Sequence, residues 1–367
     1  MIDASLYLSI YSLTSFVLTM VMSSIYSRMP DSRIDSQKPT SSIAGWMIAL
    51  IFAIFFGFRP ISGYYFVDMA KYYFSYINGW GTHHTFDWNA GNYLFDNLIL
   101  EMASLEIDPS VFFFVIALIY FLGTFVAMQK LFPKDALLGF VAFLGAFSTY
   151  SYGTNGIKAG AAAALFLCAI AYRHNRVLCL MFLFLTLGFH HSMIMPVAAF
   201  IICSFFKKPK YYFILWVACV LVAALHISAF QELFALMSDE QGAIYLNAID
   251  TDWGGKSGFR IDFIIYSAMP VLVGYITIFK YKVKSENYNF ILNLYMLTNA
   301  IWMLCMYAAF TNRIAYLSWL MYPVVLIYPF LNKRFMPRQY KMAITAVWYQ
   351  LLFTLFMVYI YYGKAFK

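Results

Sequence analysis

The stretch TNGIKAGAAAALFLCAIAYRHNRVLCLMFLFLTLGFHHS, residues 154–192, decides the fold class of this chain. It contains two apolar runs, 157–172 and 177–189, that are too hydrophobic to lie anywhere but in lipid. The small side chains that follow Lys158 let a neighbouring helix or a ligand approach the backbone closely. The stretch therefore predicts two consecutive membrane helices, with a lysine at the start of the first and two histidines at the end of the second.

The whole chain has the composition of a polytopic membrane protein. Of its 367 residues, 63% are apolar and 11% are charged, whereas soluble proteins carry roughly a quarter charged residues. We expect one all-α domain over residues 1–367 with about twelve membrane helices, some of them tilted, broken or re-entrant because their apolar runs are short. The runs lie near 5–26, 43–58, 110–130, 136–152, 157–172, 177–189, 192–206, 211–227, 261–279, 288–310, 314–331 and 341–361. The first of them is expected to be a retained span rather than a cleaved signal.

The excess of positive charge fits membrane topology. The formal charge is +8, but no solvated basic domain or nucleic-acid motif accompanies it, which excludes nucleic acid as a partner. Alternate connections carry 17 of the 25 Lys and Arg residues on one side and 8 on the other. The basic side is therefore expected to be cytoplasmic, with both termini outside.

Two long connections, 59–109 and 228–259, lie on the outer side, where we expect the working surface. In the first, the segments 68–80 and 92–105 have mixed faces at helical spacing, which predicts short helices at the membrane interface. In the second, the sequence NAIDTDWGGKSG at 247–258 is typical of a mobile flap.

Four cations on the outer side lie at the ends of membrane helices: Arg59, Lys158, Arg260 and Arg313. The last three open a helix, where the helix dipole disfavours positive charge, so we expect them to compensate for an anion. Arginine offers forked donors that match phosphate oxygens. The alternative is that each cation reaches lipid headgroups or pairs with a nearby carboxylate, such as Asp262 beside Arg260. Either Asn155 or Thr154 can cap the helix of Lys158.

The histidines divide into two pairs. His190 and His191 end a span, and Ser192 is a candidate N-cap for the next helix. His190 is the better candidate for a general base near neutral pH, although a lone interfacial histidine is more often structural. His83 and His84 lack acidic or cysteine partners at ligand spacing, so no metal site is expected. The five cysteines are expected to be packing residues: Cys168, Cys179, Cys203, Cys219 and Cys305.

Helical spacing places Asp68, Lys71 and Tyr72 on one face. This face suits either a sugar, held by hydrogen bonds and stacking, or an ordinary surface salt bridge. Other aromatic residues are more typical of an interfacial belt than of sugar platforms. They are Tyr64, Tyr65, Trp80, Trp88 and Trp253.

The chain resembles the EpsG family of bacterial exopolysaccharide proteins, which belongs with the Wzy-type polysaccharide polymerases. The resemblance covers residues 45–205 and continues beyond them as a pattern of apolar spans with Arg260 and Arg313. This chain has Lys158 and Ala159 where the family more often has Arg-Gln, and it lacks the acid common near residues 89–93, for which Asp87 or Asp96 can substitute. The matching positions are Phe58, Arg59, Gly63, Asp68 and Tyr72; Asn155 and Lys158; Arg173 and Arg176; and Phe189, His190 and Ser192.

The resemblance implies a polymerase at the outer, periplasmic face of the bacterial inner membrane. It would transfer a growing glycan from undecaprenyl pyrophosphate to a lipid-linked repeat unit, without a metal or other cofactor. The four cations would hold pyrophosphate, and His190, or alternatively Asp68, would take the acceptor proton. Support and sugar contacts would come from Asn155, Tyr72, His191 and Ser192. Expected partners are membrane lipids, a chain-length regulator and a flippase.

Two other functions remain open on the sequence. An O-antigen ligase uses the same donor with a lipid A core acceptor, although the outer loop is modest for a ligase. A transporter of an anionic or lipid-linked solute should show inverted repeats and polar helices at mid-membrane. The charges here gather at one edge instead, which favours surface chemistry.

Overall fold

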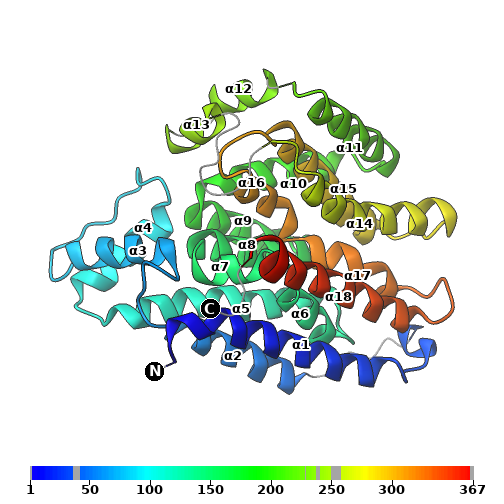
Figure 1. Cartoon of the computed structure of the whole chain (residues 1–367), viewed down its shortest axis with the longest axis horizontal. Helices are drawn as coiled ribbons and strands as arrows, with labels where there is room; N and C mark the ends of the chain where they lie inside the picture. Colours follow the sequence, from blue (N-terminus) through cyan, green and yellow to red (C-terminus); the bar gives the residue numbers. More distant parts are fainter. Residues whose placement is uncertain (1, 36–41, 228, 237–239, 249–257, 364–367) are drawn as a thin grey trace. The chain divides into compact units, whose positions relative to one another are not determined.

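The computed structural model describes residues 2–35, 42–227, 229–236, 240–248 and 258–363. Every regular element in these ranges is helical (Figure 1). Contacts within the chain divide it into two compact units, described separately below. Unit 1 comprises Met1–Ile194 and Phe330–Lys367, and unit 2 comprises Met195–Pro329. The all-α prediction is confirmed.

The helices of unit 1 follow the predicted apolar runs closely, and two more occupy the connection 59–109. They are α1 (Tyr7–Tyr26), α2 (Ile43–Gly57), α3 (Val67–Asn78), α4 (Tyr93–Ser104), α5 (Pro109–Leu131), α6 (Ala136–Leu144), α7 (Thr149–Thr154), α8 (Ile157–Ala171), α9 (Arg176–Phe189) and α18 (Gln339–Leu355), with short turns η2 (Asp31–Asp35) and η3 (His191–Met193). The helices α3 and α4 confirm the helical prediction for segments 68–80 and 92–105.

Unit 2 begins with α10 and ends within α17. Its helices are α10 (Ile194–Phe205), α11 (Pro209–Ala224), α12 (Ala229–Leu236), α13 (Glu240–Asn247), α14 (Ile261–Tyr275), α15 (Glu286–Leu304), α16 (Thr311–Trp319) and α17 (Tyr322–Asn332). The connection 228–259 thus contains two helices, α12 and α13, that the sequence did not predict. Most of the predicted flap at 247–258 lies outside the described residues.

Five helical segments of the described chain are long and apolar enough to cross a membrane, which confirms a polytopic membrane protein. They are Ala4–Tyr26, Pro109–Leu131, Ile261–Lys280, Thr311–Asn332 and Gln339–Tyr361. Five apolar helices are shorter, with 10–17 residues: Ile43–Gly57, Ile157–Ala171, Arg176–Phe189, His191–Phe205 and Pro209–Ala224. Length and composition therefore support five crossings directly rather than twelve.

Small residues allow close packing around α8. This helix packs against α5 on one side and α9 on the other, and its alanines from Ala161 to Ala164 are buried. A Cβ atom at Gly160 would lie 2.6 Å from the carbonyl oxygen of Tyr152 in α7. The glycine therefore permits the approach of α7 to α8, as the small-residue pattern predicted. All five cysteines are buried, which agrees with their predicted packing role.

The predicted span 136–152 is broken, and side chains satisfy the backbone groups at the break. The helix α6 ends at Leu144, and α7 begins at Thr149. Backbone carbonyls without helical partners are costly in an apolar environment unless other groups bond to them. The donors are the Gln350 amide to Ala142 O, the Thr149 hydroxyl to Phe143 O (2.6 Å), the Tyr11 hydroxyl to Leu144 O (2.5 Å) and the Thr354 hydroxyl to Gly145 O (2.9 Å). Helices α1, α7 and α18 thus stabilise the end of α6.

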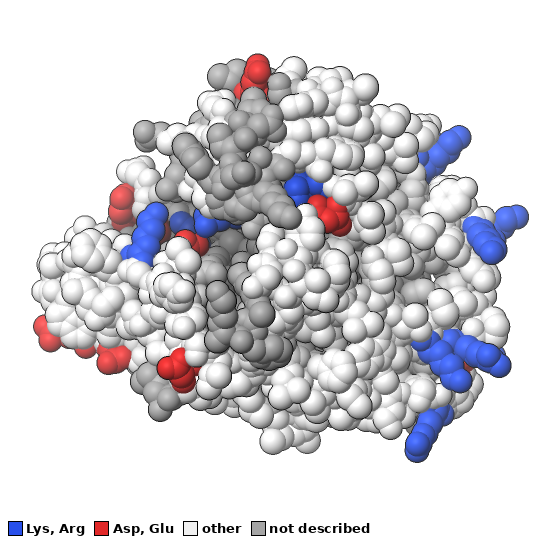
Figure 2. All heavy atoms as spheres, viewed as in Figure 1, with Lys and Arg blue, Asp and Glu red and all other residues white. Residues whose placement is uncertain are grey.

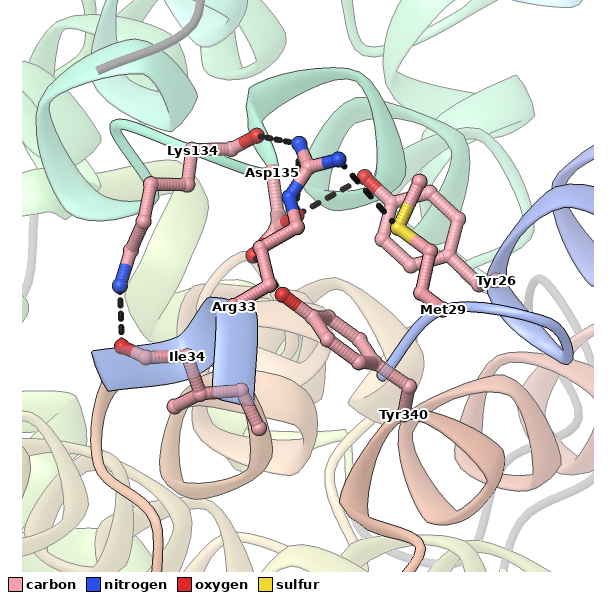
Figure 3. A network of polar contacts seen from close by, with 7 residues as sticks. All are labelled: Tyr26, Met29, Arg33, Ile34, Lys134, Asp135 and Tyr340. Atoms are coloured by element: carbon pink, nitrogen blue, oxygen red, sulfur yellow. Dashed lines mark hydrogen bonds and ion pairs between the residues drawn. The ribbon is translucent and has the colours of Figure 1, made fainter. Parts of the chain in front are cut away.

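A polar network closes the opposite end of unit 1 around Asp135 (Figure 3). The Asp135 side chain is only 1% exposed and accepts hydrogen bonds from Tyr26 (3.0 Å) and Tyr340 (3.4 Å). Arg33 lies 3.8 Å from the carboxylate and donates to the Lys134 carbonyl at 3.1 Å. Burial raises the pKa of Asp135, although these neighbours act in the opposite direction. The network joins α1, α18 and the connection before α6.

Three basic connections that the sequence assigned to one side meet at this network. They contain η2, residues 132–135 and residues 333–338. Arg334 pairs with Asp35 at 3.6 Å, and the Arg338 N–H donates to Asp31 at 2.6 Å. Figure 2 shows Lys and Arg side chains gathered where Figure 1 draws η2 and the α17–α18 connection, at the right of the view. The predicted grouping of these connections is confirmed.

In unit 2, a buried amide on one helix, α15, bonds to three others, α11, α14 and α16. The Asn299 side chain on α15 accepts a hydrogen bond from Trp216 Nε1 of α11 at 2.9 Å. It also bonds to the hydroxyls of Ser267 (3.1 Å) and Ser318 (3.0 Å). The helices α11 and α15 pack together, so this amide fixes their register. At one end of the unit, Lys207 pairs with Glu286 at 3.3 Å, which brings together two connections predicted to share a side.

Candidate functional site

The helical hairpin of α8 and α9 places Lys158 and His190 at the same end. The two helices pack against each other and are joined by the four residues 172–175. Asn175 caps α9, accepting a hydrogen bond from the Leu178 N–H at 3.2 Å. Because α8 and α9 run antiparallel through a short turn, the second residue of α8 lies at the level of the last residues of α9. The two best candidate residues of the sequence therefore lie at the same end of one hairpin.

The start of α8 differs from the prediction in its cap. Gly156, not Asn155 or Thr154, is the N-cap residue, and no side chain bonds to the first turn. The Thr154 hydroxyl instead donates back to Tyr150 O at 2.8 Å. The Asn155 Oδ1 atom is buried and has no hydrogen-bond donor within the described part of the chain. The capping role was wrong because Asn155 belongs to the tight turn that follows α7, with its N–H bonded to Ser151 O.

Lys158 lies in the first turn of α8 and is half-buried. No side chain caps this turn, so the positive end of the helix dipole lies close to the Lys158 backbone. Arg260 is the N-cap residue of α14, and Arg313 is the third residue of α16. The prediction that these three cations open helices is confirmed.

Arg59 fastens the end of α2 to the turn before α8. Its guanidinium donates to Phe56 O at 2.5 Å and to Thr154 O at 2.9 Å. The side chain is 3% exposed and lies between the rings of Phe66 and Phe113, 5.4 and 5.3 Å from their centroids. Burial lowers the pKa of the Arg59 guanidinium to about 10. This value is far above neutrality, so the charge remains beside the turn that carries Lys158.

The two histidines at the end of α9 have different environments. His190 is half-buried and takes an extended backbone conformation, and its N–H bonds to Thr186 O at 3.2 Å. His191 is exposed, and its N–H donates to the Asn92 side chain at 3.0 Å. Ser192 lies inside η3, whose N-cap residue is His190. The prediction that Ser192 caps the next helix was therefore wrong, because an extra turn separates α9 from α10.

The helix α3 brings Asp68 and Tyr72 to the same region. Asp68 and Tyr72 are half-buried, whereas Lys71 is exposed. The Tyr72 ring contacts Phe95 of α4, with centroids 5.5 Å apart, and Phe95 contacts Phe189 at 6.4 Å. Tyr72 also lies close enough to Arg59 to act on its pKa. A path of aromatic contacts therefore leads from the Asp68 helix to the residue before His190.

The other two predicted cations lie in unit 2. The Arg260 guanidinium bonds to Asp262 through Nε at 3.0 Å and Nη2 at 2.7 Å, and it lies 3.5 Å from the Phe263 ring centroid. Arg260 is 4% exposed, so the alternative of pairing with Asp262 is confirmed. Arg313 is exposed, with its guanidinium 4.7 Å from the Phe310 ring centroid. That these arginines meet Arg59 and Lys158 of unit 1 stays a prediction.

The family model that matches this chain is that of the EpsG family, over residues 44–367. The chain belongs to the EpsG family. No curated protein and no solved structure matches it. The family match covers both units, so the EpsG assignment reaches beyond residues 45–205, where the motifs were found.

In this EpsG protein, two groups near the site escaped the sequence analysis. One is the Thr154 carbonyl that binds Arg59, since a backbone acceptor leaves no trace in a sequence. The other is Asn92, which precedes α4 and binds His191; its position at a helix start was the available signal. Asp96, a possible substitute for the family's acid, accepts hydrogen bonds from the Asn92 N–H at 3.0 Å and from the Asn92 side-chain amide at 3.4 Å. Asp96 therefore holds the start of α4, whereas Asp87 is exposed.

Proposed function

We propose that this protein is a polysaccharide polymerase that transfers a growing glycan from a polyprenyl pyrophosphate to a lipid-linked repeat unit. Membership of the EpsG family supports polysaccharide synthesis at a membrane. One structural observation carries the finer proposal. The α8–α9 hairpin holds a cation in the first turn of a helix that no side chain caps, and a titratable histidine at the same end.

The proposed reaction needs a base and an anion stabiliser. The acceptor hydroxyl oxygen bonds to the anomeric carbon of the donor glycan while the bond from that carbon to pyrophosphate breaks. The hydroxyl proton passes to the imidazole of His190, or alternatively to Asp68. The polyprenyl pyrophosphate leaves with the electron pair, and Lys158 and the N–H groups that open α8 stabilise its charge. Tyr72 lines the path of the sugars.

The three arginines have different roles in the proposal. Arg59 donates to the backbone carbonyls of Phe56 and Thr154, so it holds the turn that precedes Lys158 and adds positive charge beside that turn. Arg313 is exposed, whereas the buried Arg260 guanidinium binds Asp262, so Arg313 is the better candidate in unit 2 for a pyrophosphate ligand. His191, Asn155 and Ser192 support the site through the backbone around His190 and Lys158.

The membrane arrangement belongs to the same proposal. We place the enzyme in the bacterial inner membrane, with the α8–α9 end at the periplasmic face and the Asp135 end at the cytoplasmic face. The five shorter apolar helices cross as tilted spans, and α15 and the broken α6–α7 segment add two more to the five long spans, which gives about twelve crossings. Undecaprenyl-pyrophosphate-linked oligosaccharide is the substrate, a chain-length regulator and a flippase are partners, and no metal takes part.

The experiment uses purified protein and the lipid-linked repeat unit of its own host, with product length read on a gel. Wild-type protein should lengthen the glycan, and His190→Ala should slow extension by about 10²–10⁴-fold, as expected for loss of a general base. The matched control is His83→Ala, an exposed histidine of the outer connection that should extend normally. A wild-type protein that never lengthens the repeat unit refutes the polymerase.

Two outcomes would favour the other functions. Transfer of a single repeat or finished chain to a lipid A core, without lengthening, would identify a ligase. Accumulation of repeat units on the cytoplasmic leaflet in cells that lack the protein would identify a transporter.

A further inference from the structure

A loop in the outer connection is held in place by one buried amide. Asn97 of α4 is 4% exposed. Its Oδ1 accepts from the Asp87 N–H at 2.7 Å and contacts His84 Nε2 at 2.9 Å. Its Nδ2 donates to Asp87 O at 2.8 Å and to Tyr93 O at 2.5 Å. Both backbone groups of Asp87 are thus bound, which fixes the chain immediately before Trp88.

The loop presents a row of aromatic rings. Trp88 is 68% exposed and Phe86 is 47% exposed, and their ring centroids are 4.6 Å apart. Trp88 also lies 5.9 Å from Tyr93, which contacts Phe184 of α9 at 5.7 Å. The Tyr93 hydroxyl donates to Phe184 O at 3.2 Å. An exposed tryptophan is therefore held on a rigid base instead of a loose loop.

This row is continuous with the candidate site. Asn92, next to Tyr93, accepts the hydrogen bond from His191, the neighbour of His190. On the other side, Phe184 belongs to an exposed apolar face of α9 that includes Val177, Leu180 and Met181. A molecule with a sugar part and a polyprenyl tail can therefore contact the row and the apolar face at once.

We infer that Trp88 is a stacking platform for a pyranose ring of the lipid-linked glycan. This inference rests on the proposed function and names a glycan-binding residue for it. A flat, rigid indole offers a large contact area at low cost in conformational entropy. Sugars present an apolar C–H face for stacking and hydroxyls at the rim, and the exposed Asp87 and Asn89 lie beside the ring in sequence to bind those hydroxyls.

An interfacial belt residue is the competing explanation for Trp88, and one feature argues against it. A belt residue needs only to reach the headgroup region. Such a role does not require the three contacts that Asn97 makes to His84 and Asp87 of the loop. A second exposed aromatic pair of the same connection, Tyr64 and Tyr65, has ring centroids 4.8 Å apart and serves as a comparison, because Tyr64 is 84% exposed.

The test measures sugar binding apart from catalysis. The probe is the repeat-unit oligosaccharide released by mild acid from the host polysaccharide, so that it carries neither lipid nor pyrophosphate. Binding to the purified full-length protein is followed by saturation-transfer NMR. Trp88→Leu should weaken binding about tenfold, which is about 1.4 kcal/mol, whereas Trp88→Phe should stay within about threefold because it keeps a flat ring. Tyr64→Leu should bind as the wild type does.

In the extension assay, Trp88→Leu should raise KM for the lipid-linked repeat about tenfold and change kcat less than about twofold, since it alters uniform binding. Unchanged oligosaccharide binding in Trp88→Leu overturns the inference, as does equal weakening in Tyr64→Leu, which would identify a general interfacial effect. Trp88-dependent binding in a protein that never extends glycans would uphold the platform and refute the polymerase. Normal extension with an unaltered KM in Trp88→Leu would uphold the polymerase and refute the role of Trp88 as a platform.

Discussion

The hydroxyl of Tyr11 offers a direct test of how unit 1 tolerates the broken span between α6 and α7. It donates to Leu144 O at 2.5 Å, and the side chain is 4% exposed. Tyr11→Phe removes this one donor and keeps the ring in its contacts with Phe52 and Phe56, 5.9 and 5.6 Å between centroids. The substitution therefore removes the hydroxyl, with its bond to Leu144 O and its contacts to Ser15 and Thr149, and keeps the packing of the ring.

The expected cost follows from the carbonyl left behind. A buried acceptor that loses its donor destabilises a protein by about 1–3 kcal/mol. Leu144 is the last residue of α6, so helical bonding does not replace the lost donor. For a unit of this size, 1 kcal/mol corresponds to roughly 2–4 °C in Tm, so Tyr11→Phe should lower Tm by about 4–8 °C at the middle of that range.

A thiol-reactive fluorescent dye provides the assay. Cys168 and Cys179 of unit 1 are buried and free, so they react with the dye only as the unit unfolds on heating. The matched control is Tyr64→Phe, which removes the hydroxyl of a side chain that is 84% exposed and should leave Tm unchanged. Equal Tm values for Tyr11→Phe and wild type would refute the argument that side-chain donors stabilise the break.

Three further predictions test other contacts. Burial raises the pKa of Asp135 above 3.8 in the folded protein, so the wild type loses stability as the pH rises from near 3.8 through the raised value. The difference in Tm between the wild type and Asp135→Asn should therefore fall from pH 4 to pH 8. A constant difference in Tm would contradict this prediction. Asn299→Leu leaves the Trp216 N–H without its acceptor and should cost about 1–3 kcal/mol, seen as a lower Tm when the dye reports on the buried free cysteines of unit 2, Cys203, Cys219 and Cys305. Gly160→Ala places a Cβ 2.6 Å from Tyr152 O, so α7 and α8 must separate; glycan extension by the purified variant should drop, and normal extension would show that their spacing does not matter to the site.

The sequence predicted the elements of this fold well where one-dimensional signals are strong. The apolar runs at 157–172 and 177–189 are the helices α8 and α9, and the segments 68–80 and 92–105 contain α3 and α4. It failed to predict the break inside 136–152, because a continuous apolar run carries no signal for where a helix ends. Which short helices cross the membrane is likewise not set by length and composition alone.

For the candidate site, the sequence predicted the residue types and their helix ends but not their partners. Lys158 opens α8 and His190 follows α9, as expected. The Arg260 guanidinium donates two hydrogen bonds to Asp262, a pairing that the sequence left open. Arg59 binds Thr154 O, and Asn92 binds His191 N–H; neither contact was foreseen.

There is a physical reason why the sequence predicts the helices but not the contacts between them. Transfer from water to lipid and the distribution of basic connections depend on each segment's own composition, so the amino-acid order alone determined an all-helical membrane protein with cations at helix N-termini. A hydrogen bond depends on the position and direction of two groups that the chain can separate by many residues. Only the tertiary structure therefore decided that Arg59 reaches across 95 residues to Thr154 and that Tyr11 reaches Leu144.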